Sequence, residues 1–187
     1  MTETVEPDVV DLLLAQHTQI RALFDEVLTA LGEHKRDRFQ DLVRLLAVHE
    51  AAEEELIHPR VRVEVAAAGP VVDQRLDEEQ AAKQELARLY DLGTDHVDFD
   101  RGLTALAKDV VAHATREEQE EFPYLRGVLS ADELHRLANA LRAAQSLAPT
   151  RPHPSVPPSA LANVIAGPPL AVFDRIRDAI RDFGGDG

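Results

Sequence analysis

The sequence of 187 residues contains no cysteine and no tryptophan, and only 4% of its residues are aromatic. The absence of cysteine excludes thiolate-bound zinc, cysteine-held iron–sulfur clusters, disulfides and cysteine nucleophiles. The apolar residues are nearly all alanine, leucine and valine, a mixture that favours helices over sheets. The composition therefore favours an all-α protein without thiol chemistry.

Long apolar runs and clusters of positive charge are also missing. No apolar run approaches the ~18 residues of a membrane span, and the first residues do not begin a signal peptide, so we expect a cytoplasmic protein without a membrane partner. The formal net charge is −14, and the basic residues gather only in a short stretch at 34–38. Because nucleic-acid binding needs a positive surface, we expect no nucleic-acid partner.

The sequence does contain a repeated pair of metal-ligand residues. His49 and Glu53 stand four residues apart, as do His113 and Glu117, and on a helix this spacing puts both side chains on one face. The first pair lies 64 residues before the second. The same separation joins two further pairs, Pro59 with Pro123 and Arg62 with Arg126. We interpret this register as an internal duplication of a helix pair.

Hydrophobic periodicity predicts five helices before a proline-rich segment. The helices are expected at about 7–32, 37–67, 71–91, 99–128 and 130–147, with a loop at 92–98. We predict an up-down-up-down four-helix bundle with an added fifth helix, together spanning residues 1–147. Residues 148–169 should form an extended proline-rich segment. Residues 170–187 should form an amphipathic C-terminal helix and tail that can dock on the bundle or make a homodimer.

The inward-facing polar residues predict a metal centre. His17 lies in the apolar stripe of the first helix, and the two His/Glu pairs lie in the stripes of the second and fourth. Burying such groups unpaired costs several kcal/mol. Imidazole and carboxylate together suit iron, manganese or zinc, and two carboxylates able to bridge suit two ions better than one.

With these residues in view, the chain resembles the hemerythrin-like family, also called the HHE cation-binding domain. The matching positions are His17, His49 with Glu53, and His113 with Glu117, within a region of roughly residues 8–145. The resemblance implies a four-helix bundle that holds two non-haem iron ions bridged by the two glutamates, with manganese or zinc as possible substitutes. It also implies a small ligand, since family members bind oxygen or nitric oxide, sense iron or redox state, or handle peroxide.

The sequence departs from the family pattern at one position. Counting 63 residues along the duplication aligns His17 with Gln80, where the family has a histidine, and an amide oxygen is a weak ligand. Water, Glu79 or Glu50 could complete that coordination, so Glu50 and Gln80 are weaker ligand candidates. The missing histidine ligand argues against reversible oxygen carriage, because that function needs a metal site whose other ligand positions are filled.

The remaining polar residues are expected on the surface. The solvated face should contain five glutamates: Glu54, Glu55, Glu118, Glu120 and Glu121. The surface histidines should be His34, His58, His96, His135 and His153.

Three functions remain open on the sequence. The leading hypothesis is a di-iron protein that binds or reacts with oxygen, nitric oxide or peroxide in sensing, storage or detoxification. An alternative is a metal-free or weakly metallated bundle that acts as an interaction module. A third is a peroxide-consuming enzyme that uses the iron position left incomplete by Gln80, although the sequence shows no acid or base placed for that work.

Overall fold

The computed structural model describes residues 6–64, 69–147, 174, 176–178 and 181. In these residues it contains helices and no strands, in agreement with the all-α prediction. The elements are α1 (Val9–Thr29), α2 (Gly32–Ala52), η1 (Glu53–Ile57), α3 (His58–Glu64), α4 (Gly69–Leu92), α5 (Phe99–Arg116), η2 (Glu117–Glu121), α6 (Phe122–Val128) and α7 (Ala131–Leu147). No helix among the described residues is long and apolar enough to cross a membrane.

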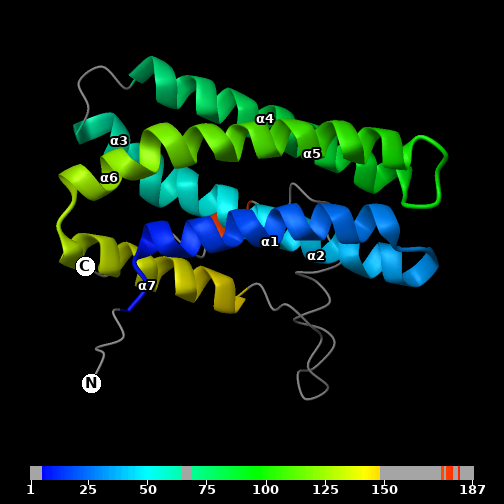
Figure 1. Ribbon diagram of the computed structural model, residues 1–187, viewed down its shortest axis with the longest axis horizontal. Helices are drawn as coiled ribbons and strands as arrows, with labels where there is room; N and C mark the ends of the chain where they lie inside the picture. The colour runs from blue at the N-terminus through cyan, green and yellow to red at the C-terminus, as the bar shows by residue number, and fades with distance from the viewer. Residues whose placement is uncertain (1–5, 65–68, 148–173, 175, 179–180, 182–187) are drawn as a thin grey trace.

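The four long helices run back and forth along one axis, as Figure 1 shows. α1 packs against α2 and α5, and α4 packs against α5. α7 lies across α1 and α2 at one end of the bundle, where it covers the core as an added helix. The predicted up-down-up-down bundle with a fifth helix is therefore confirmed.

The amino ends of two helices form as the sequence predicts. The Asp8 carboxylate accepts a hydrogen bond from the backbone N–H of Asp11, and the Asp11 carboxylate accepts one from Asp8. Ser130 and Glu133 exchange the same pair of bonds before α7. Each side chain satisfies a backbone donor that the first helical turn would leave unpaired, which fixes where the helix begins.

The connection between α1 and α2 is shorter than predicted. We expected the second helix to begin at about residue 37, but α2 begins at Gly32, which adopts a φ of +57°. Leu31, which lies within the range expected for the first helix, is 83% exposed in this tight turn. A residue without a Cβ adopts a left-handed backbone at little cost, so Gly32 reverses the chain there.

Each of the two repeated motifs contains a π-helical turn. η1 begins at Glu53 and η2 begins at Glu117, and the backbone N–H groups of His58 and Phe122 bond to the carbonyls five residues earlier. Pro59 and Pro123 follow directly. A proline ring clashes with the carbonyl four residues before it in a regular α-helix, so a wider turn lets the helix continue. The helix expected at 37–67 is therefore irregular before Pro59, and the duplication extends to the backbone.

The C-terminal predictions fall mostly outside the described residues. The proline-rich segment at 148–169 lies outside them entirely. Of the predicted helix at 170–183, the described residues are helical, and Ile176 is buried in the hydrophobic core cluster. Arg177 donates a hydrogen bond to Glu54 at 2.7 Å, and Arg181 donates two to Glu55. These contacts connect the C-terminal helix to η1.

Candidate metal centre

Five polar side chains that the sequence singled out converge in the interior of the bundle. His17, His49, Glu53 and Glu117 each offer one ligand atom within 4.8 Å of the others, and all four are buried. A second group consists of Glu53, Glu79, His113 and Glu117. Since the two glutamates of the π-helical turns belong to both groups, the arrangement has two adjacent positions that share two carboxylates.

The histidines of the first group are oriented by hydrogen bonds at their outer nitrogens. Nδ1 of His17 lies 2.8 Å from a carboxylate oxygen of Glu118, and Nδ1 of His49 lies 3.0 Å from the amide oxygen of Gln16. An oxygen of either kind can only accept a hydrogen bond, so Nδ1 is the donor and Nε2 of the neutral ring presents a lone pair. The two Nε2 atoms face each other at 3.0 Å. Two lone pairs this close favour a cation between them.

The histidine of the second group has the same arrangement. Nδ1 of His113 lies 2.9 Å from a carboxylate oxygen of Glu78, and its Nε2 lies 3.0 Å from Glu117. A histidine that donates its outer N–H to a carboxylate or carbonyl while its inner nitrogen faces a shared centre is the usual arrangement around a protein-bound metal.

The carboxylate oxygens at the centre lack hydrogen-bond donors. Within the described part of the chain, neither oxygen of Glu53 or Glu117 accepts a hydrogen bond, and neither does Oε2 of Glu79. Buried carboxylates without donors are costly, because desolvation is not compensated. A divalent or trivalent cation would satisfy all of these atoms at once, so the donor set fits a pair of bound metal ions.

The shared carboxylates have opposite proton affinities in the metal-free protein. Burial raises the pKa of Glu53 well above its ordinary value, and the neighbouring charge of Glu117 raises it further. Burial alone would also raise the pKa of Glu117, but the adjacent imidazoles of His113 and His17 bring it below its ordinary value. Without metal, a proton at the centre therefore binds Glu53 in preference to Glu117.

The pKa values of His49 and His113 are also shifted in opposite directions. Burial, with the neighbouring His17, lowers the pKa of His49 well below its ordinary value, so this ring is neutral and ready to bind metal. Burial alone would lower the pKa of His113 too, but the adjacent carboxylates of Glu117 and Glu78 raise it to about 9. Since ligands bind metal in their deprotonated forms, loading the centre at neutral pH must release protons from His113 and Glu53.

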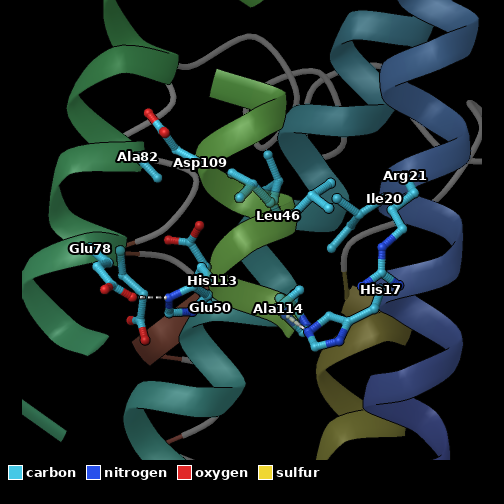
Figure 2. Close-up of a pocket in the computed structure, with 14 residues that line it drawn as sticks. His17, Ile20, Arg21, Leu46, Glu50, Glu78, Ala82, Asp109, His113 and Ala114 are labelled. Carbon is cyan, nitrogen blue, oxygen red and sulfur yellow. Dashed lines mark hydrogen bonds and ion pairs between the residues drawn. The ribbon is translucent and has the colours of Figure 1, made fainter. Parts of the chain in front are cut away.

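A small cavity opens onto the centre. Its volume is about 30 Å³, and Figure 2 shows His17 and His113 on opposite sides of it. Its wall also includes Glu50, whose side chain is buried, and apolar residues from four helices: Ile20, Leu46, Ala82, Val110 and Ala114. The space admits a molecule of about the size of water and presents it to both histidines.

The prediction that Gln80 faces inward is wrong. Its side chain is exposed, and the buried residue at this turn of α4 is Glu79, which is 1% exposed. Glu79 lies 62 residues after His17, so α4 is offset from the 64-residue register of the other motifs. The oxygen ligand that the sequence left open between several candidates is thus available as a carboxylate rather than an amide. Glu50, the other weaker candidate, is buried but belongs to neither ligand group and faces Lys83 at 3.8 Å.

The placement of His58 and Glu121 on the surface is also wrong. Both are buried: Nε2 of His58 lies 2.6 Å from Glu79, and Nδ1 lies 3.5 Å from Glu121. In a regular α-helix His58 would point about 140° away from Glu53, and the π-helical turn brings it closer to the same face. Glu121 stands four residues after Glu117, and this spacing was a signal that could have identified it as an inward residue.

The other polar residues assigned to the surface divide into two classes. His34, His96 and Glu120 are exposed, as predicted, whereas His153 lies outside the described residues. Glu54, Glu55 and Glu118 are only partly exposed, because each takes part in an ion pair. Buried Lys83 donates a hydrogen bond to Glu54 beside the metal groups. These carboxylates are part of the packing around the centre.

Comparison with known proteins identifies the family. The hemerythrin HHE cation-binding domain matches residues 8–125. An uncharacterised hemerythrin-like protein of Schizosaccharomyces pombe is 24% identical over 175 residues, which cover 92% of this chain and 86% of that protein. A DNA nickase of Nostoc is 28% identical over 138 residues, 73% of this chain but only 38% of the nickase.

A solved structure agrees with the fold. The crystal structure of a hemerythrin HHE cation-binding domain-containing protein from Mycobacterium kansasii superposes with a TM-score of 0.66 and 20% sequence identity. The match covers 76% of this chain and 88% of that one. At this identity the likeness supports the helical bundle and not a shared activity.

Proposed function

The chain belongs to the hemerythrin HHE cation-binding domain family, and we propose on that premise that it holds two non-haem iron ions that bind or react with a small oxidant. The observation that supports this most directly is the pair of four-residue groups that share Glu53 and Glu117. One ion would be held by His17 and His49 and the other by His113 and Glu79, with the shared glutamates bridging them.

The donor set supports iron as the resident metal. Imidazole nitrogens and carboxylate oxygens are ligands for iron, manganese and zinc, and the chain has no thiolate to favour a softer ion. When bound, a pair of iron ions supplies redox-active centres with an exchangeable position for an oxidant. The protein contributes the orientation of the ligands through Gln16, Glu78 and Glu118, which fix the three imidazole rings.

The cavity supports a ligand of two or three atoms, such as oxygen, nitric oxide or peroxide. Its volume of about 30 Å³ is too small for an organic substrate. Its wall is mostly apolar, which suits a neutral diatomic molecule. The one buried acidic group in the wall outside the ligand groups is Glu50, in the part of the chain that the structure describes. Burial, with the charge of Glu79, raises the pKa of Glu50 well above its ordinary value, so its carboxyl can donate a hydrogen bond to a bound oxygen atom.

Filling the cavity should block the small ligand and spare the metals. Ala82 lines the cavity from α4, while the adjacent Ala81 is exposed and does not line it. We expect Ala82→Leu to keep both iron ions and to weaken nitric oxide binding at least about 10-fold, since a few added methyl groups remove the available space. Ala81→Leu, the matched control, should bind nitric oxide as the parent does.

The measurement is an anaerobic titration of the iron-loaded proteins with nitric oxide, followed by absorbance, with iron determined on the same samples. Equal nitric oxide affinity in both variants would contradict the assignment of this cavity as the binding site. A parent protein that binds iron but shows no response to nitric oxide, oxygen or peroxide would contradict the proposed function itself.

A further inference from the structure

The two halves of the duplicated bundle differ at a pair of positions that touch each other. His17 in α1 corresponds in space to Glu79 in α4, since each completes one ligand group. Phe122, the residue after η2, lies 64 positions beyond His58, the residue after η1. Each contact joins the two halves: at the first ligand group His17 meets Phe122, and at the second ligand group Glu79 meets His58.

Each pair is chemically matched. The ring of Phe122 stacks on the ring of His17, with centroids 5.5 Å apart and planes inclined by 19°. A neutral imidazole packs well against such an apolar surface. A carboxylate beside the same phenyl ring would be desolvated without a donor, which is costly. At the second ligand group, Nε2 of His58 lies 2.6 Å from Oε1 of Glu79 and supplies that donor.

The contact with His58 determines which oxygen of Glu79 faces the centre. With Oε1 occupied, Oε2 is the oxygen that accepts no hydrogen bond within the described residues. The other ring nitrogen of His58, Nδ1, lies 3.5 Å from a carboxylate oxygen of Glu121, which orients the ring. Arg75 donates a hydrogen bond from Nε to Glu121 at 3.0 Å, and both of these side chains are buried. The chain of contacts leaves Glu79 one orientation, with a single oxygen free for metal.

We propose that His58 is the positioning residue that makes Glu79 a one-oxygen metal ligand, and that the two metal positions are consequently unequal. This inference rests on the proposed two-metal centre. The position at His17 and His49 offers two nitrogens and the shared carboxylates, while the position at His113 and Glu79 offers one nitrogen and an additional carboxylate. Carboxylate-rich sites suit manganese, and imidazole-rich sites suit zinc and iron. The second position therefore discriminates less against Mn²⁺ than the first.

An exchange of the paired residues between the two ligand groups tests this inference. His58→Phe reproduces the residue found at the equivalent position 122 beside the first ligand group and removes the donor to Glu79, so the second Mn²⁺ should bind about 10- to 100-fold more weakly, the usual effect of losing an outer partner of a metal ligand. The first Mn²⁺ should bind as in the parent. Adding Glu79→His to His58→Phe should restore two tight positions and raise the preference for Zn²⁺ over Mn²⁺ at the second.

Two further variants separate positioning from folding. His58→Gln retains an N–H donor and should recover most of the second-site affinity lost in His58→Phe. Gln80→His places an imidazole at the exposed position next to Glu79, so the affinities for the first and the second Mn²⁺ should both stay unchanged. The readouts are electron paramagnetic resonance of bound Mn²⁺ during titration and competition with Zn²⁺, with circular dichroism to establish that each variant is folded.

The possible results distinguish a failure of the role of His58 from a failure of the two-metal centre. A parent that binds two ions, together with a folded His58→Phe variant whose second affinity is unchanged, would overturn the role of His58 alone. If His58→Phe does not fold, His58→Gln decides, since loss of the second ion despite a retained donor would also overturn it. A parent that binds fewer than two ions would contradict the proposed function, and this inference with it.

Discussion

Replacing Glu53 by alanine should reduce bound iron from two ions per chain to less than half an ion. Glu53 belongs to both ligand groups, so its loss removes one donor from each position and the bridge between them. Losing a residue that hydrogen-bonds to a metal ligand typically weakens metal binding 10- to 100-fold. Losing one of four direct ligands weakens it more, and Glu53→Ala removes a direct ligand from both metal positions. The measurement is iron content after gel filtration in the presence of a weak chelator.

The matched controls distinguish ligand loss from unfolding. Glu53→Gln keeps the size of the side chain and removes its ability to bridge as an anion, so it should also lose iron while remaining folded. Asp77→Ala removes an exposed carboxylate from α4, two residues before Glu79, and should retain two ions. Retention of two ions in a folded Glu53→Gln protein would show that this glutamate is not a shared ligand.

Removing the metals should lower the melting temperature by at least about 10 °C at pH 7. Metal that binds only the folded state stabilises it by about 4 kcal/mol per site at 1,000 times the dissociation constant. For a chain of this length each kcal/mol shifts the melting temperature by about 2–4 °C. Calorimetry with and without a strong chelator gives the difference directly. An unchanged melting temperature would favour the metal-free interaction module.

The difference in melting temperature between the metal-loaded and the metal-free protein should widen as the pH rises from 7 to 9. In the metal-free protein, burial alone would lower the pKa of His58, but Glu121 and Glu79 raise it to about 10, and the pKa of His113 is raised to about 9. In the unfolded chain both titrate near 6.5. Their contribution to stability is complete below about pH 6.5 and is lost as the pH rises toward 9 and 10.

The metal-free protein loses stability as the pH rises because its folded state holds more protons than its unfolded state. Between pH 7 and 9 the folded metal-free state holds protons on these histidines that the unfolded state has lost, so its stability falls by up to about 1.4 kcal/mol per pH unit for each group. Protonated Glu53 acts in the same direction. In the loaded protein, metal replaces the protons of His113 and Glu53, so the fall is smaller. A difference between loaded and metal-free protein that narrows from pH 7 to 9 would contradict this explanation.

The sequence predicted the bundle because its core residues follow the helical period closely. The two His/Glu pairs could be recognised for the same reason, since a four-residue spacing on a helix puts both side chains on one face. The shared 64-residue register then predicted that both pairs point into the same interior. The structure brings these four side chains together with His17.

The register of α4 could not be obtained from apolar periodicity. Its buried face includes three charged residues, Arg75, Glu79 and Lys83, which a hydrophobic pattern assigns to solvent. Their own four-residue spacing was the available signal. We aligned His17 with Gln80 on the assumption that the loops of the two halves differ little, and a shift of one residue moves a side chain about 100° around a helix.

The environment of His58 was missed for a different reason. An α-helical projection places it away from the metal-facing side, and the π-helical turn at η1 changes that projection. Pro59 indicated an irregularity but not its kind. The ion pairs of the C-terminal helix with Glu54 and Glu55 were missed because they join residues more than 120 positions apart, with no periodic signal connecting them.

Anomalous diffraction from crystals of the iron-loaded protein, recorded on both sides of the iron absorption edge, tests the central claim most directly. We expect two peaks in the bundle interior, one beside His17 and His49 and one beside His113 and Glu79, with Glu53 and Glu117 reaching both. A single peak, or two peaks with Glu79 turned away from the second, would contradict it.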